Sequence, residues 1–397
     1  MADVLGCCRA GRIPIDIGVS GRDSFVNKSG KPRIAVIGSK GLPSNASGLE
    51  VYVQNICVGL SDDFEITVFA RKRYCTEVLK EYKGVRIVHV PSINTKHLDA
   101  ITYTFFATIK ALIIGYDLFW FHSLGPAVTM PLVKLFRKRI LSTVHGLDWK
   151  REKFGKLASA VLKYGEKCIA KYADEIITLQ KYDAQYFQEK WGRNTNQISN
   201  GVNEAQTLKT QIITQQYGLN GGDYYLFMSR IVPEKGLHTL IEAYNKSGSN
   251  KKLLVAGKGV HTSDYVGRIS ELAAKNNRII LAGQVDGDIK KELYSNAFAY
   301  VLPSTIEGQS IGLLEAMSYG LPCVVSDIPE NVDVIGNAGF PFICGDSDSL
   351  SEVLQYIEEH PDEACCAGKK SQEIIDSEYN LDKSISRTKE VIIKALA

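Results

Sequence analysis

The chain of 397 residues is long enough for two or more domains, and its 45% apolar content is ample for packed cores. We expect no membrane span, because the longest apolar run, residues 101–114, is too short and contains Lys110. We also expect no secretory signal, since Asp16 interrupts the first apolar run. The nine cysteines lack zinc-site spacing, which indicates free thiols in a reducing cytosol.

The net charge of +3 conceals two halves of opposite sign. Residues 31–204 contain 25 Lys and Arg against 16 Asp and Glu, whereas residues 205–397 contain 18 against 25. A basic first half predicts an anionic partner, for which a charged lipid, a membrane surface and a nucleic acid are candidates. The sequence contains no nucleic-acid-binding motif, so we expect no nucleic-acid partner.

Residues 1–30 are polar, rich in glycine and aperiodic, so we interpret them as a disordered or artefactual extension. From residue 31, short apolar runs alternate with helical patterns, which predicts a parallel, doubly wound α/β domain over residues 31–205. Strands are predicted at 33–38, 65–70, 85–91, 118–122 and 140–144, and residues 175–178 and 196–203 complete this domain. Helices are predicted near 48–60, 99–114, 126–136 and 155–171.

A Gly-rich loop follows the first predicted strand and contains Gly38, Gly41 and Gly48. This spacing is not the G-x-G-x-x-G of a dinucleotide site, which argues against an NAD-dependent oxidoreductase. The longer loop suits a mobile cover over a sugar phosphate, with Gly48 at the start of the next helix.

His145 and Gly146 directly follow a predicted strand and therefore lie at the mouth of the sheet, where open α/β sheets bind ligands. His145 either faces a ligand or is a hydrogen-bonded turn histidine. Trp149, Lys150 and Arg151 come next along the chain.

Lys156, Lys163 and Lys167 fall on one face of the following predicted helix. Such a face is either simply solvated or an interfacial patch beside anionic lipid. The sequence leaves both interpretations open.

The same alternation of strands and helices returns in residues 206–377, which we assign to a second Rossmann-like domain. Its strands are predicted at 224–229, 252–256, 279–282, 299–303, 323–326 and 340–343. Residues 378–397 are predicted to form a separate amphipathic helix, with Ile385, Val391, Ile392, Ile393 and Leu396 as its apolar residues.

Two strand-to-helix junctions of the second half carry charged residues. Arg230 and Lys235 follow one predicted strand, and Glu307 follows another, with Glu315 eight residues later. Gly308 allows a tight loop, so we expect Glu307 in the loop and Glu315 on the helix. Alternatively, Glu307 caps the helix and Glu315 is a solvated surface charge.

The helix after Glu307 begins near Gln309, Ser310 and Ile311, whose backbone N–H groups would then be free to bind an anion. Carboxylates on either side of such a turn suit a ligand with a diphosphate and sugar hydroxyls. Gly257 and Lys258 follow a further strand and form either a turn near the same ligand or a simple loop.

These motifs resemble a known family. The Ser229–Gly236 and Glu307–Glu315 stretches are similar to the donor site of family-4 retaining glycosyltransferases, whose fold is GT-B. The Gly38–Glu50 and His145–Arg151 stretches resemble the bacterial rhamnosyltransferase subgroup. The resemblance implies an interdomain cleft, an acceptor-binding first domain, a nucleotide-sugar-binding second domain and a last helix that crosses back to the first domain.

The resemblance also implies roles for individual residues. Those implied for catalysis are His145, Arg230, Lys235 and Glu307. Those implied for donor binding are Gly48, Arg230, Lys235, Gly257, Lys258, Gln309, Ser310, Ile311 and Glu315. Acceptor binding is assigned to Trp149, Lys150 and Arg151. Many family members have Phe-Gly where this chain has Gln309-Ser310, which affects the expected sugar preference.

We expect neither a metal nor a cofactor. The Asp-x-Asp string Asp346-Ser347-Asp348 precedes a predicted helix, so capping explains it better than Mg²⁺ binding. The implied reaction is transfer of a hexosyl group to a lipid-linked saccharide in bacterial surface polysaccharide synthesis. The first donor expected is dTDP-rhamnose, with UDP-hexoses as the alternative. The implied location is the cytoplasm, including the cytoplasmic face of the membrane. A non-catalytic scaffold on the same fold is a further alternative.

Overall fold

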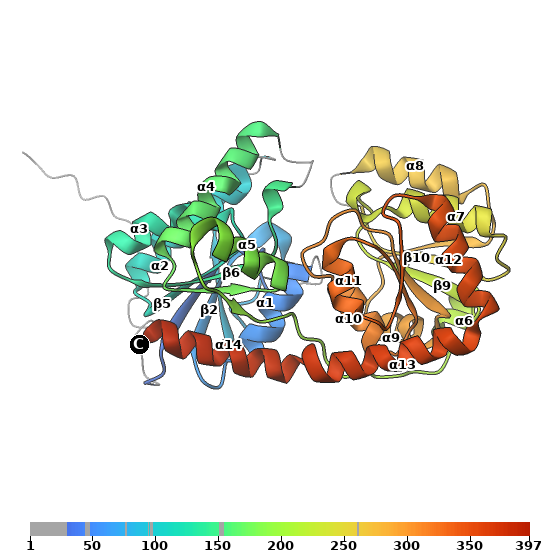
Figure 1. Ribbon diagram of the computed structural model, residues 1–397. Coiled ribbons are helices and arrows are strands. Elements are labelled where there is room, and N and C mark those ends of the chain that lie inside the picture. The colour runs from blue at the N-terminus through green and yellow to red at the C-terminus, as the bar shows by residue number, and fades with distance from the viewer. Residues whose placement is uncertain are drawn as a thin grey trace, which may run out of the picture.

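The structure is a computed structural model that describes residues 30–43, 48–75, 78–93, 95, 98–150, 155–259 and 262–397. It consists of two α/β lobes side by side, joined along one edge by two long helices (Figure 1). The predicted extension is residues 1–30, and all of it except Gly30 lies outside the described residues.

The N-terminal lobe contains an eight-stranded sheet in the order β3-β4-β2-β1-β5-β6-β7-β8. Its strands are β1 (Arg33–Ile37), β2 (Glu65–Arg71), β3 (Glu81–Tyr82), β4 (Val85–Val90), β5 (Leu118–His122), β6 (Arg139–Val144), β7 (Glu175–Thr178) and β8 (Asn196–Gln197). Every pair is parallel except β3 with β4. The sequence analysis missed β3, because a two-residue edge strand has too few side chains to show a period of two.

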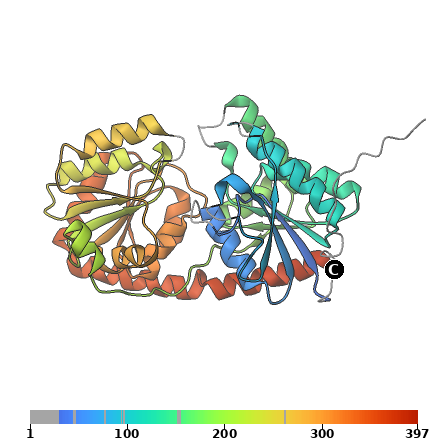
Figure 2. The same ribbon diagram turned by 180° about the vertical axis from the view of Figure 1, so that it is seen from behind.

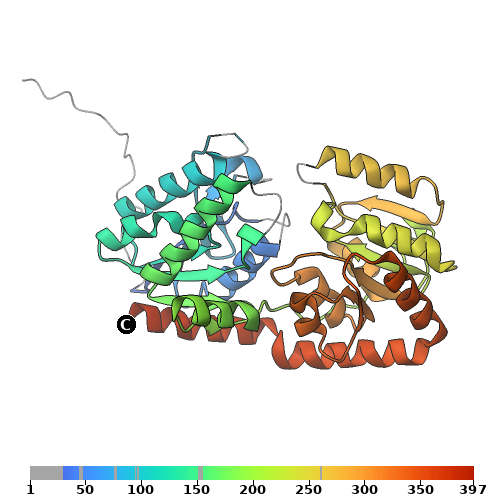
Figure 3. The same ribbon diagram turned by 45° about the horizontal axis from the view of Figure 1, so that its top comes forward.

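Helices cover both faces of this sheet (Figures 1 and 3). They are α1 (Gly48–Gly59), α2 (Leu98–Ile114), α3 (Met130–Leu135), α4 (Lys156–Tyr172) and α5 (Lys181–Trp191). In β1, Ile34 and Val36 pack into one hydrophobic cluster, and Ala35 and Ile37 into another on the opposite face. A strand buried on both faces has no polar side, which explains why it appears in the sequence as a continuous apolar run.

The C-terminal lobe contains a six-stranded, wholly parallel sheet in the order β11-β10-β9-β12-β13-β14. Its strands are β9 (Tyr224–Met228), β10 (Lys252–Ala256), β11 (Ile279–Gly283), β12 (Ala299–Leu302), β13 (Cys323–Ser326) and β14 (Phe340–Phe342). Its helices are α6 (Ile212–Tyr217), α7 (Leu237–Ser247), α8 (Ser263–Ala273), α9 (Gly287–Asn296), α10 (Ile311–Ser318), α11 (Pro329–Ile335) and α12 (Ser347–Glu359). Two Rossmann-like lobes are the predicted architecture.

The Asp-x-Asp string lies at the start of α12. Asp346 is the N-cap residue, and its Oδ1 accepts hydrogen bonds from the backbone N–H groups of Asp348 at 2.8 Å and Ser349 at 3.1 Å. This arrangement confirms the interpretation of Asp346 as a helix cap.

The last two helices run along one edge of both lobes (Figures 1 and 2). Helix α13 (Pro361–Glu378) contacts α10 of the C-terminal lobe, whereas α14 (Leu381–Leu396) contacts α1, β6 and β7 of the N-terminal lobe. Ile392 is fully buried there, but Ile393 is 52% exposed, so Ile393 does not belong to the apolar face on which the sequence analysis placed it. Within the described residues, none of the helices is both long and apolar enough to cross a bilayer.

The start of α14 is bonded to the chain that leaves β8. The Val202 N–H donates to the Tyr379 carbonyl at 2.9 Å, and the Leu381 N–H donates to the Val202 carbonyl at 3.2 Å. Gly201 lies beside this ladder, where a Cβ would overlap the Leu381 backbone and lie 2.9 Å from the Ser384 hydroxyl.

We therefore expect Gly201→Ala to lower the free energy of unfolding by about 1–3 kcal/mol, because backbone cannot move aside as a flexible side chain can. Urea unfolding followed by circular dichroism measures the change. Gly267→Ala in α8 is the matched control, since a Cβ there meets nothing within 4 Å and alanine favours a helix. Equal stability of Gly201→Ala and the parent protein would contradict the prediction.

Candidate active site

The centre of the candidate site is a buried ion pair in the C-terminal lobe. The Lys235 Nζ donates to Glu307 Oε1, and the Ser304 hydroxyl donates to the same oxygen at 2.6 Å. The two charged side chains are only 9% and 8% exposed. The pair joins two loops at the carboxyl edge of the sheet, the position at which open α/β sheets bind ligands.

Gly236 makes this approach of the two loops feasible. It follows the 3₁₀ turn η5 (Pro233–Lys235) and has a φ of 65°. A Cβ at Gly236 would overlap the Pro303 carbonyl oxygen. Glycine is therefore required both for the left-handed backbone and for the close contact with the end of β12.

Arg230 lies five residues before Lys235, on the loop after β9. Its side chain is half-buried, and among the described residues no ion-pair partner is found for it. The same loop contacts the turn after β10, because the Ile231 N–H donates to the Lys258 carbonyl at 3.0 Å. Gly257 in that turn has a φ of 152°, and a Cβ there would overlap the Ser229 carbonyl, whereas Lys258 is exposed.

The helix after Glu307 begins where the sequence predicts, with Glu307 in the loop and Glu315 on α10. Ser310 is the N-cap residue, and its hydroxyl accepts from the Leu313 N–H at 3.4 Å. Glu307 is therefore not the cap. No protein acceptor is found, within the described ranges, for the backbone N–H groups of Ser310 and Ile311. These two amides are available to an anion at the positive end of the helix.

The Gln309 side chain forms a hydrogen bond between the two lobes. Its Oε1 accepts from the Asn200 N–H at 2.6 Å, and its backbone carbonyl accepts from the Asn200 side-chain amide at 3.2 Å. Gln309 is 9% exposed and Asn200 3% exposed. The predicted donor-binding role of Gln309 is thus limited to its backbone, and Asn200 is a contact that sequence reasoning missed.

Glu315 is not a free surface charge either. Its Oε1 accepts from Lys290 of α9 at 2.5 Å, and its Oε2 accepts from the Tyr294 hydroxyl at 3.3 Å. Its side chain is 25% exposed. A ligand group that hydrogen-bonds to Glu315 would have to compete with Lys290, whose side chain is 35% exposed.

His145 lies on the opposite side of the cleft, directly after β6. Its Nε2 lies 3.1 Å from Nδ1 of His122, the last residue of β5, and the Tyr52 ring packs edge-on at 5.0 Å between centroids. Burial lowers the pKa of His145 to about 3. Burial also lowers the pKa of His122 well below its ordinary value, with the neighbouring His145 as a second cause. Both rings are therefore neutral near pH 7, so His145 can offer a hydrogen bond but not a positive charge.

The two lobes touch where His145 meets the Glu307 loop. A Cβ at Gly308 would overlap the His145 carbonyl oxygen, and a Cβ at Gly146 would lie 3.2 Å from the Gly308 Cα. Gly48, at the start of α1, faces the same helix end, because a Cβ there would lie 3.7 Å from the Ile311 side chain. Gly48, His145, Glu307 and Ile311 are thus brought to the same part of the cleft.

A narrow pocket opens between the lobes beside this contact. It is lined by Gly146, Leu147, Lys150, Gln180, Tyr182, Asp183, Ile306, Glu307 and Glu330. Asp183 is 3% exposed, and its buried Oδ2 has no hydrogen-bond partner among the described residues. Burial, followed by the charge of Glu330 from the other lobe, raises the pKa of Asp183 to about 7.

The three predicted acceptor-binding residues have different surroundings. The Trp149 indole N–H donates at 2.7 Å to Glu166, a fully buried carboxylate that also accepts from Lys190 at 2.7 Å. Lys150 donates to the Tyr182 hydroxyl at 2.7 Å and lines the pocket. Arg151 lies outside the described residues. Of the three, Lys150 is placed to meet a ligand, whereas the polar end of Trp149 faces the protein interior.

Sequence reasoning also missed His122 and Asp183. Of two neighbouring parallel strands, β5 ends at His122 and β6 is followed directly by His145, and this repetition was the available signal for His122. Asp183 carried no such signal, because an acidic residue in the first turn of a helix is common.

Comparison with known proteins agrees with this geometry. The model described as Glycosyltransferase Family 4 matches residues 46–206, and the model described as Glycosyl transferases group 1 matches residues 209–376. O-antigen chain mannosyltransferase B of Escherichia coli is 28% identical over 152 residues, which are 37% of this chain and 40% of that protein. The UDP-Gal:alpha-D-GlcNAc-diphosphoundecaprenol alpha-1,3-galactosyltransferase of Escherichia coli is 26% identical and covers 64% of this chain and 68% of its own.

The structure of sucrose-phosphate synthase from Thermosynechococcus elongatus superposes with a TM-score of 0.80 at 19% identity, covering 91% of this chain and 98% of that one. At this identity the likeness establishes the fold alone, which is GT-B, as predicted. The two family matches together span both lobes, and the chain belongs to the glycosyltransferases of the family 4 and group 1 type. The match spans only 40% of the mannosyltransferase, so it does not establish which reaction this chain catalyses.

The buried carboxyl of Asp183 leads to a prediction about pH. In the unfolded chain this carboxyl loses its proton near pH 4, whereas in the folded chain it does so near pH 7. The folded state therefore binds the additional proton between about pH 4 and 7, and its stability falls as the pH rises through that window. Asp183→Asn removes this loss.

We expect Asp183→Asn to raise the melting temperature above that of the parent protein at pH 8 and to have little effect at pH 4. The pKa difference of about three units between the folded and unfolded chain corresponds to at most about 4 kcal/mol in the free energy of unfolding. Differential scanning calorimetry at both pH values measures the change, with the exposed Asp288→Asn as control. A difference that is the same at pH 4 and pH 8 would refute the predicted pKa.

Proposed function

We propose that this protein transfers a sugar from a nucleoside-diphosphate sugar to a saccharide acceptor with retention of the anomeric configuration. The observation that carries the proposal is the convergence of Lys235, Glu307 and the free amides at the start of α10 opposite His145. Fixed cations and helix-end amides at one sheet edge suit a leaving diphosphate, because such donors stabilise charge that develops in the transition state.

In the proposed reaction, the bond between the anomeric carbon and the diphosphate oxygen breaks. An acceptor hydroxyl then forms the new bond on the same face, and its proton passes to the leaving phosphate oxygen. Arg230 and Lys235 neutralise the diphosphate, with Arg230 acting through its planar fork. The neutral His145 and Glu307 orient the donor sugar, and Glu315 binds the ribose. Domain roles follow: residues 31–205 bind the acceptor and residues 206–377 the nucleotide-sugar.

The acceptor proposed is a lipid-linked saccharide of bacterial surface polysaccharide synthesis. Both Escherichia coli relatives support this class by name, one as an O-antigen enzyme and the other with a diphosphoundecaprenol acceptor. The galactosyltransferase uses UDP-Gal by its name, which favours a UDP-hexose over dTDP-rhamnose as donor. The rhamnose donor stays a prediction from the motif resemblance. Turnover with a panel of dTDP-rhamnose, UDP-glucose, UDP-galactose and UDP-N-acetylhexosamines separates the two.

A cytoplasmic location with contact to the inner membrane face is part of the same proposal. On α4, Lys156, Lys163 and Lys167 are exposed, together with Leu157 at 82% and Tyr164 at 52% exposure. Basic and apolar side chains side by side on one helix suit the surface of an anionic bilayer.

Arg230 and Lys235 should respond differently to substitution. We expect Arg230→Gln to lower kcat by about 100-fold with little change in melting temperature, because its side chain has no ion-pair partner within the described ranges to leave unpaired. Lys235→Gln should lower both turnover and stability, because it leaves the Glu307 carboxylate buried without its cation.

Steady-state kinetics on the best donor of the panel and thermal unfolding provide the two measurements. Lys275→Gln, an exposed lysine after α8, is the control for loss of one positive charge. Undiminished turnover in Arg230→Gln would remove this residue from the site. Absence of turnover and of nucleotide binding in the parent protein would instead favour a non-catalytic scaffold.

Independence from metal ions also stays a prediction. The proposed neutralisation of the diphosphate uses only Arg230, Lys235 and the α10 amides. The turnover rate in about 5 mM EDTA should therefore equal the turnover rate in about 5 mM Mg²⁺. An activity that requires Mg²⁺ would show that the protein cations do not suffice.

A further inference from the structure

A fully buried histidine, His122, lies directly beside His145. His122 is the last residue of β5, whereas His145 follows β6 and is partly exposed. The His122 Nδ1 lies 3.1 Å from the His145 Nε2, which is hydrogen-bond distance. Both rings are neutral, and a neutral imidazole has one N–H group and one lone pair. One ring therefore donates to the other, and the direction of this bond decides which nitrogen of His145 carries the proton.

The other nitrogen of His122 indicates the direction of the bond. His122 Nε2 is buried and has no hydrogen-bond partner among the described residues. Buried N–H groups without an acceptor are rare, because such a group loses its water and gains nothing in exchange. The rings of Trp120 and Tyr52, with centroids 4.8 and 5.9 Å from that of His122, would accept an N–H only weakly. His122 Nε2 is therefore the nitrogen without a proton, and Nδ1 is the donor.

A second histidine of the same lobe shows the same distribution of protons. The His89 Nε2 lies 2.9 Å from the Leu79 carbonyl oxygen, which can only accept, so this nitrogen carries a proton. In the neutral ring Nδ1 is then unprotonated, and the His89 Nδ1 is buried without a partner within the described ranges. The nitrogen without a partner is thus the unprotonated one in His89, which matches the assignment in His122.

The position of the His145 proton follows from that of the His122 proton. His145 Nε2 accepts from His122, so the single proton of the neutral His145 ring is on Nδ1. In the part of the chain that the structure describes, the His145 Nδ1 has no hydrogen-bond partner. His145 lies where Gly308 of the Glu307 loop meets the N-terminal lobe, so this N–H is available to a ligand in the cleft.

We infer that His122 is a positioning residue that fixes the tautomer of His145, so that the His145 Nδ1–H donates a hydrogen bond to the donor sugar. This inference rests on the proposed function and adds the direction of the bond. The sugar must present an oxygen lone pair at this point, as a hydroxyl or a ring oxygen does. The opposite tautomer would present a lone pair to the cleft and could not bind a ring oxygen.

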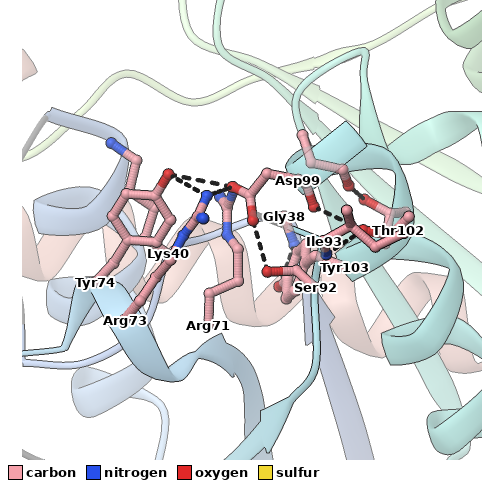
Figure 4. Close-up of polar contacts among 12 residues, drawn as sticks. Gly38, Lys40, Arg71, Arg73, Tyr74, Ser92, Ile93, Asp99, Thr102 and Tyr103 are labelled. Carbon is pink, nitrogen blue, oxygen red and sulfur yellow. Dashed lines mark hydrogen bonds and ion pairs between the residues drawn. The ribbon is translucent and has the colours of Figure 1, made fainter. Parts of the chain in front are cut away.

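The backbone of His122 is fixed by both neighbouring strands. Strand β5 lies between β1 and β6, and His122 is in register with Thr143 of β6. After β1, a Cβ at Gly38 would overlap the His122 carbonyl oxygen, so the two chain segments are in direct contact. Gly38 is itself held, because its N–H donates to the Tyr103 hydroxyl at 3.2 Å (Figure 4). His122 therefore belongs to a rigid part of the sheet, as a group that orients another side chain requires.

The tautomer is measured directly by NMR of protein whose histidine nitrogens are isotopically labelled, at about pH 8, above the ordinary pKa of an imidazole. Protonated and unprotonated ring nitrogens differ widely in chemical shift, and their couplings to the ring carbon protons distinguish Nδ1 from Nε2. The chain contains seven histidines, so His122→Asn and His145→Asn assign the two signals by their loss.

We expect the proton on Nδ1 in both His122 and His145. His89 is the internal reference, with its proton on Nε2. A His145 ring with its proton on Nε2 would overturn the inference, whether or not turnover is found, because this measurement needs no substrate.

Two substitutions at His122 separate positioning from packing. In His122→Asn the side-chain amide supplies an N–H near the place of Nδ1, whereas His122→Leu fills similar space without a donor. We expect His122→Leu to lower kcat/KM for the nucleotide-sugar about tenfold, the effect of one hydrogen bond that is no longer directed. His122→Asn should restore kcat/KM to within about threefold of the parent value. The His145 signal should stay that of the Nδ1 tautomer in His122→Asn and become a mixture of both tautomers in His122→Leu.

His360→Leu is the control for loss of a histidine, because His360 lies between α12 and α13, where its ring stacks on Tyr356. Its kcat/KM should equal that of the parent protein. Equal losses of kcat/KM and melting temperature in His122→Asn and His122→Leu, with an unchanged His145 tautomer, would show that His122 only fills space and would contradict the inference. If no nucleotide-sugar is turned over by the parent protein, the proposed function fails, and the His145 signal in the two variants still decides the role of His122.

Discussion

The buried ion pair between Lys235 and Glu307 is the interaction on which the rest of the cleft depends. It draws the loop after β9 onto the loop before α10, and Gly236 makes that contact sterically feasible. The position of the Glu307 loop in turn determines where Gly308 meets His145 and where the α10 amides point. Because both charges are removed from water, neither can lose its partner without a large cost, so the geometry persists without a ligand.

A second constraint comes from the contacts between the lobes. Helix α14 continues from the C-terminal lobe and packs on α1, β6 and β7, while Asn200 and Gln309 join the lobes inside the cleft. The lobes therefore meet both along an edge and at the candidate site. If the two lobes bind the two substrates as proposed, these contacts determine how the substrates would face one another.

Charge is distributed unevenly across the cleft. Asp183 and Glu330 line a pocket beside Gly146, whereas Lys40, Arg71 and Arg73 gather at the carboxyl ends of β1 and β2 on the same lobe as Asp183. His145 is neutral, because burial disfavours its protonated form.

The sequence by itself determined the order and type of the main elements, because a buried parallel strand is a local pattern. The predicted bounds of β5, β10 and β13 agree with the structure, and so does the division of Glu307 and Glu315 between loop and helix. Only the tertiary structure decided which side chains meet: His122 with His145, Gln309 with Asn200, and Glu315 with Lys290. These partners lie 23, 109 and 25 residues apart along the chain. The order of the strands and the packing of the lobes bring them together, and a local sequence pattern encodes neither of these.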